Sequence, residues 1–560
     1  MSKAVFNYGS DGKSVGEVKA RIEKEGIIER IWKKDYTIWG KEPAEIANRL
    51  GWLDSPAQAK EQLKAILSFA EEIKKEGFEN ALLLGMGGSS LAPEVFSRIF
   101  GNKEGFPKLY VLDSTHPDNI DEFVKKLNPE KTLYIVSTKS GGTIETISFM
   151  KFFYTYAAGK LGEEKAGRHF VAITDPGSGL QDYAVKLNFR EIFLNNPDIG
   201  GRFSAVSLFG LVPAAVIGAD IEKLLENTSK IMDECRNNIE GNSGALAGVF
   251  MGEAALRGVD KLTFVISKSL YPFGVWAEQL IAESTGKTGK GILPIEGEKL
   301  LHPEYYGKDR LFVYLKLKGE NEYDKGIEQI EKAGFPLVRV ELDTTYELCG
   351  EFFRWEFATA AAGYIMAVQP FDQPNVESAK VLARETIKEY QKNRILPEPE
   401  ASFTEEGMSV YTDLESKNIQ DTVRGFLNTL AGNGYVSIQA YVKNGKEIDK
   451  ALTALRDKIQ LNYKTAVTVG IGPRFLHSTG QLHKGDKGNG LFIQLIAPNE
   501  TDYSIPEEAL SINSTFTFGI LVEAQSLGDR QALLNNERKV LRIKLTADTV
   551  SSISKITEKL

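Results

Sequence analysis

The sequence contains few of the side chains that bind metals or form disulfides. Only two cysteines, Cys235 and Cys349, occur in 560 residues, and they lie far apart and outside any CxxC pattern. A disulfide framework and a cysteine-ligated zinc site are therefore excluded. None of the five histidines stands in HxxxH or HExxH spacing, which argues against a protein-bound catalytic metal. We therefore expect no metal site.

Long apolar runs and an excess of positive charge are also missing. No run of 18 or more apolar residues occurs, and the polar start "MSKAVFNYGSDGKS" does not have the shape of a signal peptide. The net charge of −8 offers no basic face to nucleic acid. We therefore expect a cytoplasmic protein without nucleic-acid or membrane partners, in which loops bind any anionic ligand locally.

Short apolar strands alternate with helical segments from about residue 55 to 385, a pattern that favours α/β architecture with parallel sheets. We interpret 1–54 as an N-terminal helical segment and expect two α/β units over 55–215 and 216–395. A Pro- and Glu-rich linker, "KNRILPEPEASFTEEG", precedes strands and helices of a smaller C-terminal α/β domain. Residues 396–560 form this third unit.

The stretch "STKSGGTIET", residues 137–146, lies between an apolar strand and a helical segment. The free backbone N–H groups at a helix start, together with hydroxyls, one lysine and two glycines, suit an anion such as phosphate. The alternative is a simple helix cap, because Thr143 to Thr146 reads "TIET", a helix-start signature. We interpret Glu145 as such a helix-start or structural residue.

A second loop, "GMGGSS" at residues 85–90, repeats this arrangement within the same predicted sheet. It is not a Walker A loop and lacks the third glycine of the dinucleotide fingerprint. Two Ser/Gly loops at the carboxyl ends of parallel strands can converge on one ligand. Together they favour a phosphomonoester over a nucleotide.

Five motifs follow one another in a recognisable order: "GMGGSSLAPE", "STKSGGTIET", "GGRFSAVSLFGLVP", "WAEQLIAESTGKTGKG" and "FDQPNVESAK". In this order and spacing, residues 50 to 385 resemble the phosphoglucose isomerase family, whose fold is two sugar-isomerase (SIS) domains. The resemblance implies flavodoxin-like parallel sheets flanked by helices, a hexose 6-phosphate substrate and a homodimer. Beyond the linker, "GPRFLHSTGQLHKG" resembles the carboxyl-terminal extension of the isomerase half in fused transaldolase/phosphoglucose isomerases. We expect no transaldolase activity, because too little chain precedes the first strand.

The chemistry implied by the resemblance is proton transfer between C2 and C1 of an open-chain sugar, for which one carboxylate suffices as base and then acid. This chemistry requires no metal and no organic cofactor. Glu283 matches the family's base, and Gln279, four residues earlier on one helix face, a ligand-binding glutamine. Arg202 matches the arginine that stabilises the enediolate. From sequence alone, Glu283 reads as a surface carboxylate and Arg202 as an interdomain ion-pair partner.

Further positions match the family less closely. Gln373 and Lys380 match residues that touch the sugar phosphate, and Lys380 would also assist ring opening. His302, in "GEKLLHPEYYG", falls about where the family places its ring-opening histidine, often supplied by a neighbouring subunit, although a surface histidine is the open alternative. The loop residues expected to bind substrate are Gly88, Ser89, Thr138, Lys139, Ser140, Thr143 and Gly201.

Other polar groups are left outside the predicted site. Gly141 and Gly142 replace aromatic and hydroxyl residues common in related isomerases. His477 and His483 could form a site of the third domain, but polar loop residues of this sort are more often structural, and we leave them out of the site. We interpret Glu278 and Glu296 as solvated carboxylates.

The leading hypothesis is thus an isomerase that interconverts glucose 6-phosphate and fructose 6-phosphate. An isomerase that also accepts mannose 6-phosphate would share the same residues and stays open. A sugar-phosphate sensor built on SIS domains would need the phosphate loops but neither Glu283 nor Arg202.

Overall fold

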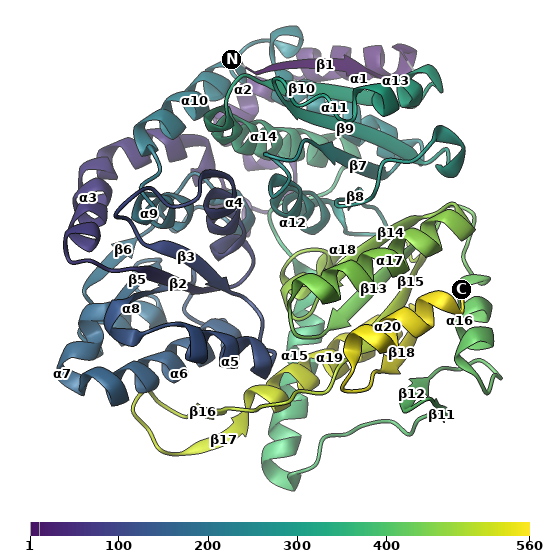
Figure 1. Cartoon of the computed structure of the whole chain (residues 1–560). Helices are drawn as coiled ribbons and strands as arrows, with labels where there is room; N and C mark the ends of the chain where they lie inside the picture. Colours follow the sequence, from purple (N-terminus) through teal and green to yellow (C-terminus); the bar gives the residue numbers. More distant parts are fainter. Residues whose placement is uncertain (1, 10–11) are drawn as a thin grey trace.

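Three mainly parallel sheets organise the chain, and the computed structural model describes residues 2–9 and 12–560 of it (Figure 1). We call 55–215, 216–395 and 396–560 the first, second and third units. In Figure 1 the first sheet lies at the left, the second at the top and the third at the lower right.

The first sheet has the order β3-β2-β4-β5-β6, and all its neighbours are parallel. Its interior strands are short apolar runs buried on both faces, as expected where helices cover both sides of a sheet. The order matches the flavodoxin pattern, which confirms the predicted fold class. The strands are β2 (Asn80–Gly85), β3 (Lys108–Leu112), β4 (Thr132–Ser137), β5 (Phe170–Thr174) and β6 (Glu191–Leu194).

The second sheet repeats this order as β8-β7-β9-β10 and adds β1 at its edge. β1 (Lys3–Asn7) pairs antiparallel with β10, whereas the other pairs are parallel. The segment 1–54, expected to be helical, therefore also supplies an edge strand. The remaining strands are β7 (Lys261–Ile266), β8 (Leu293–Ile295), β9 (Arg310–Leu317) and β10 (Leu337–Leu342).

The third sheet has the order β11-β12-β18-β15-β13-β14, in which only β11 and β12 run antiparallel to their neighbours. A separate two-stranded ribbon, β16–β17, extends towards the first unit and packs against α6. The strands are β11 (Phe403–Glu405), β12 (Met408–Tyr411), β13 (Tyr435–Tyr441), β14 (Ala466–Ile471), β15 (Gly490–Ile496), β16 (Ser504–Pro506), β17 (Ser514–Thr517) and β18 (Lys539–Lys544).

Helices cover the sheets and fill the space between them. α12 and α14 are buried on nearly every side, so neither shows the one-sided apolar stripe of a surface helix. The α-helices are α1 (Gly12–Lys24), α2 (Ile27–Trp32), α3 (Ser55–Lys75), α4 (Leu91–Phe100), α5 (Pro117–Lys126), α6 (Ile144–Leu161), α7 (Glu163–Ala166), α8 (Gly179–Lys186), α9 (Leu208–Val216), α10 (Ile221–Glu234), α11 (Ser243–Leu256), α12 (Phe273–Thr285), α13 (Asp324–Lys332), α14 (Leu348–Met366), α15 (Pro374–Asn393), α16 (Ile419–Leu427), α17 (Lys446–Tyr463), α18 (Gly480–Gly485), α19 (Phe518–Asn535) and α20 (Thr549–Glu558).

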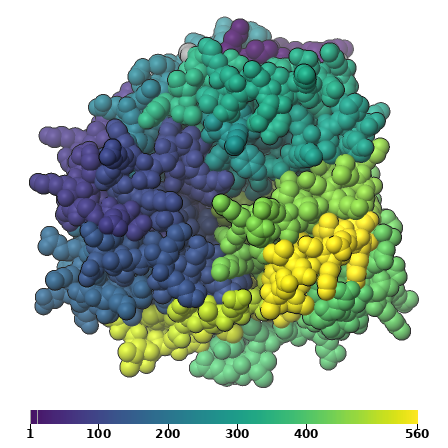
Figure 2. Space-filling model, viewed as in Figure 1, coloured from purple at the N-terminus to yellow at the C-terminus, as the bar shows by residue number. Residues whose placement is uncertain are grey.

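Apolar cores continue across the boundaries between units. One core joins the N-terminal helices and the first two units. Phe518 and Leu521 of α19 pack into the core on the other face of the first sheet, and Leu482 of α18 joins Ala282 and Leu293 of the second unit. In Figure 2 the three units, coloured purple to blue, teal, and green to yellow, meet near the centre of the view.

Both cysteines are buried and free. Among the described residues, no helix is long and apolar enough to span a membrane, and no group of three or more metal-ligating side chains is found.

Candidate active site

The two Ser/Gly loops meet at the carboxyl edge of the first sheet. β2 and β4 are neighbours, and Gly85 pairs with Ser137 at the point where both strands end. β3 lies on the other side of β2, so the strand order reverses between β2 and β4, which is where open α/β sheets bind ligands. The hydroxyl of Ser137 donates to the carbonyl of Ser89 over 3.2 Å and ties the loops together.

Glycines let the loops approach other backbone segments. A Cβ on Gly88 would lie 2.0 Å from the carbonyl oxygen of Gly201, so only glycine allows this contact. Gly141 has a φ of +69°, and a Cβ there would lie 2.3 Å from the amide nitrogen of Leu180. The departure from the family pattern at Gly141 thus has a steric reason in this chain.

A cavity of about 180 Å³ opens beside these loops. Every residue that the sequence predicted as part of a site lines this cavity, except His302. Its lining is Met86, Gly87, Gly88, Ser89, Ser137, Thr138, Lys139, Ser140, Thr143, Thr146, Gly201, Arg202, Gln279, Glu283, Gln373, Lys380 and His477. The side-chain oxygens of Gln279 and Thr146 are buried here without a protein partner, as expected for groups that face a polar ligand.

The predicted base and the predicted arginine lie together. Glu283 of α12 is 9% exposed, and its Oε2 accepts from the amide of Gln279 at 3.3 Å. A guanidinium nitrogen of Arg202 lies 3.6 Å from the same oxygen. Because a carboxylate and a fixed cation share one face of the cavity, charge that develops on a ligand there would be stabilised.

Arg202 is 3% exposed and anchored by hydrogen bonds to the second unit. Its Nε donates to Ser284, and its terminal nitrogens donate to the carbonyls of Pro370 and Asp372 and to the side chain of Gln373. Arg202 therefore connects the first unit to the second and also lines the cavity. The guanidinium holds the turn that carries Gln373 into the cavity.

Lys139 lines the cavity, but its ammonium is already engaged. It forms an ion pair with Asp175 and donates to the carbonyl of Pro197. Lys380 of α15 also lines the cavity.

The structure places His302 outside the cavity. It precedes the short 3₁₀ helix η9 (Pro303–Tyr305), its side chain is 57% exposed, and its ring nitrogen lies 3.6 Å from Glu304. His477 lines the cavity instead, from the 3₁₀ helix η11 (Arg474–His477) of the third unit. Sequence reasoning left His477 out because nothing local ties it to residues more than 190 positions away.

His477 forms a buried pair with Glu145. Its Nε2 lies 2.9 Å from Glu145 Oε1, and Gln525 of α19 donates to the same oxygen at 2.7 Å. Burial acts to raise the pKa of Glu145, but the attraction and hydrogen bond of His477 outweigh it and hold this pKa below its ordinary value. Glu145 therefore does more than begin a helix.

Glu278 was expected to be solvated, and the structure corrects this. The side chain is buried, and burial, followed by repulsion from Glu296, raises the pKa of Glu278 to about 8. Ser478, beside His477, donates to Glu278 at 3.5 Å.

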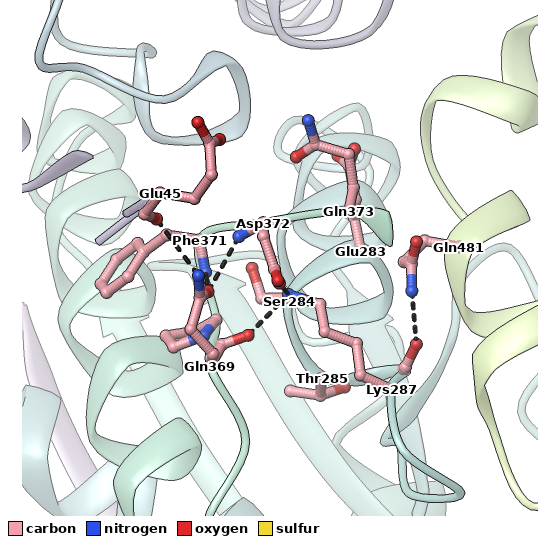
Figure 3. Close-up of polar contacts among 12 residues, drawn as sticks. Glu45, Glu283, Ser284, Thr285, Lys287, Gln369, Phe371, Asp372, Gln373 and Gln481 are labelled. Carbon is pink, nitrogen blue, oxygen red and sulfur yellow. Dashed lines mark hydrogen bonds and ion pairs between the residues drawn. The ribbon is translucent and has the colours of Figure 1, made fainter. Parts of the chain in front are cut away.

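Lys287 was also missed, although it lies only four residues after Glu283. Figure 3 shows it pointing at the turn that carries Gln373; its Nζ donates to the carbonyl of Gln369 at 2.6 Å and to Asp372 at 2.7 Å. Burial, followed by repulsion from Arg202, lowers the pKa of Lys287 to about 7 despite the attraction of Asp372. The sequence offered only its position just after the helix of Glu283 as a signal.

The turn itself is closed by Gln369. Its side-chain oxygen accepts from the amides of Phe371 and Asp372, and its side-chain nitrogen donates to the carbonyl of Glu45 (Figure 3). Lys287 is therefore a positioning residue for a turn that is fixed from three directions.

Paired flavodoxin-like sheets with hydroxyl- and glycine-rich loops around a buried carboxylate define a protein of the sugar-isomerase class. The family profile described as phosphoglucose isomerase matches residues 54–292. The glucose-6-phosphate isomerase of Mycoplasmopsis pulmonis is 30% identical over 381 residues, which cover 59% of this chain and 88% of that protein. This chain belongs to the phosphoglucose isomerase family.

Other comparisons agree. The glucose-6-phosphate isomerase of Thermus thermophilus is 29% identical over 61% of this chain and 91% of its own length. The crystal structure of a glucose-6-phosphate isomerase from Chlamydia trachomatis superposes with a TM-score of 0.61 at 18% identity, covering 70% of this chain and 89% of that one. At that identity the superposition shows the shared fold.

Replacing Gly88 tests the contact between the loops. Gly88→Ala should weaken binding of fructose 6-phosphate at least tenfold, because the new Cβ would push the Gly201 backbone away. Gly142→Ala is the matched control, since its Cβ would meet nothing closer than Ser140 Oγ at 3.5 Å. Calorimetric binding measures both, and equal affinities would contradict the steric argument.

Replacing Lys287 tests the clamp on the turn. Lys287→Met should lower kcat/KM by about 10- to 100-fold, because a loosened turn misplaces Gln373. In the unmodified chain kcat/KM should fall as the pH rises through about 7, where Lys287 loses its charge. Lys287→Arg, which keeps the charge, should remove this step. An identical pH profile in the Arg variant would show that Lys287 does not titrate in this way.

Proposed function

We propose that this chain interconverts glucose 6-phosphate and fructose 6-phosphate, with Glu283 as the group that moves the proton. The observation that carries the proposal is the juxtaposition of Glu283 and Arg202 with the two hydroxyl-bearing loops in one cavity. The names of the relatives agree with this activity. A sensor would need the loops but would have no use for the buried carboxylate and guanidinium.

The phosphate belongs at the loops. Ser89, Thr138, Ser140 and Thr143 offer hydroxyl donors, and the amino end of α6 adds free N–H groups to the same place. Because the ammonium of Lys139 is already hydrogen-bonded, it would attract the phosphate electrostatically without donating a hydrogen bond to it. The sugar then extends towards α12.

The proton transfer takes place at Glu283. As base, it removes the proton from C2 of the open-chain aldose, and as acid it returns the proton to C1, so that the enediolate forms and collapses on one face of the sugar. The hydroxyl proton passes from O2 to O1 in the enediolate, which leaves the carbonyl at C2. Arg202 stabilises the negative oxygen of the enediolate, and Gln279 and Gln373 orient the hydroxyls. Every step is ordinary acid–base chemistry, which needs no redox partner.

Ring opening precedes this step. It requires a proton on the ring oxygen and loss of the proton from the hydroxyl on C1. His477, paired with Glu145, can hold and deliver that proton, and Lys380 lines the same wall. We therefore assign to His477 the ring-opening role expected of His302. The homodimer, which the family resemblance implies, and the cytoplasmic location, which the composition led us to expect, are part of this proposal.

Glu283→Gln tests the base. The variant should isomerise about 10²–10⁴-fold more slowly, which is the usual contribution of a positioned acid–base group. It should still bind fructose 6-phosphate, because the phosphate loops are untouched. A coupled assay and calorimetry measure the two properties, with Glu385→Gln on the exposed side of α15 as the control. Substantial turnover by Glu283→Gln would remove the assignment.

His477→Asn tests ring opening separately from proton transfer. Interconversion of the α and β anomers of glucose 6-phosphate needs ring opening but no proton transfer at C2. We expect His477→Asn to lose accelerated anomerisation and Glu283→Gln to retain it, as followed by exchange NMR. His302→Asn should behave like the unmodified chain. The reverse result for the two histidines would restore His302 as the ring-opening residue.

A further inference from the structure

The third unit reaches into the cavity that the first two units form. Leu476 and His477 of η11 and Gln525 of α19 line the cavity or the hollow of about 250 Å³ that adjoins it, with Lys380 shared by both. In Figure 1, α18 and α19 lie beside α15 between the sheets. One wall of the site is thus built by residues that lie beyond position 395.

His477 is held by both other units at once. Its ring contacts Glu145 of α6 in the first unit, and its backbone carbonyl accepts from the side chain of Gln279 of α12 in the second unit at 2.6 Å. Gln279 also donates to Glu283. A single glutamine therefore joins the predicted base to the segment that carries His477.

Arg474, three residues before His477, anchors this segment through ionic contacts with the first unit. Arg474 forms an ion pair with Glu94 of α4 and lies 3.4 Å from Asp113, and both carboxylates belong to the first unit. The hydroxyl of Ser90, in the first phosphate loop, donates to Asp113 at 3.2 Å. Arg474 and Glu94 are half-buried and Asp113 is buried, so these charge contacts anchor η11 beside the loop.

The surrounding interface is packed as a protein core. A Cβ on Gly286, at the end of α12, would lie 2.3 Å from the Cα of Leu482. A Cβ on Gly528 of α19 would lie 2.7 Å from the amide nitrogen of Ala383 on α15. Contacts this close show that helices of the third unit pack directly against helices of the second, at the density of a protein interior.

From these contacts we propose that the third unit completes the catalytic site in cis, so that one chain is a whole catalytic unit. This inference rests on the proposed function and goes beyond it. The expected homodimer would then not be needed for catalysis, because the histidine wall is supplied by the same chain. Within the third unit, Gln525 acts as a positioning residue that fixes Glu145 and, through it, His477. Gln525 is itself held by the hydroxyl of Thr115, which donates to it at 2.8 Å.

Complementation tests the proposal. Glu283→Gln and His477→Asn chains, each expected to be strongly impaired alone, are co-expressed and assayed with fructose 6-phosphate. If each site is built within one chain, co-expression restores no activity, whether or not the chains form dimers. In a dimer with shared sites, mixed pairs would restore about a quarter of the unmodified activity, and such recovery would overturn the proposal.

The same experiment separates the two levels of inference. If the proposed function is wrong, the unmodified chain shows no turnover, or Glu283→Gln stays active, before any mixing. If only the cis arrangement is wrong, both single variants are inactive and their mixture recovers.

A milder variant tests the route through Gln525. Gln525→Leu should slow anomerisation and isomerisation several-fold and shift their pH dependence, because Glu145 loses a hydrogen-bond donor. The KM should stay close to that of the unmodified chain. Gln531→Leu, on the exposed side of the same helix, is the matched control. An unchanged kcat and pH profile in Gln525→Leu, with heat stability equal to the control, would show that α19 does not position the site.

Discussion

The buried guanidinium of Arg202 is the interaction on which the arrangement of the first two units depends. Taking such a group out of water costs several kcal/mol unless its N–H groups find partners. Those partners are Ser284 on α12 and the turn 370–373, both in the second unit. Because satisfying one cation requires both units, its burial sets how far Glu283 stands from the phosphate loops of the first sheet.

Those parts of the fold and of the site that follow from local sequence patterns and simple geometry could be predicted from the sequence. The loops at 85–90 and 137–146 follow adjacent strands of a parallel sheet, and such strands end at one edge. Gln279 and Glu283 stand four apart on a helix, so they share a face. The order of the motifs gave the family, and the strand alternation gave the fold class. The edge strand β1 was missed because only long-range pairing with β10 shows it.

The rest of the site could not be predicted because it depends on contacts between distant segments. His477 and Glu145 are separated by 332 positions, and neither has a local pattern that names the other. Lys287 follows a predicted catalytic helix, but its role appears only when the turn at 369–373 folds against it. Glu278 looks like any polar helix residue until the third unit covers it. The helical periodicity of a sequence does not show which residues a separate unit will bury.

In the proposed mechanism the three units supply different parts of one reaction. The first would provide the donors for the phosphate, the second the carboxylate that moves the proton, and the third the histidine that opens the ring. Such a division works only when the units hold their places within a fraction of an ångström. The core-like packing of Leu482 against Gly286, the ion pair of Arg474 and the buried bonds of Arg202 meet that requirement in different ways. Rigidity between units is therefore as much a part of this active site as the side chains that face the sugar.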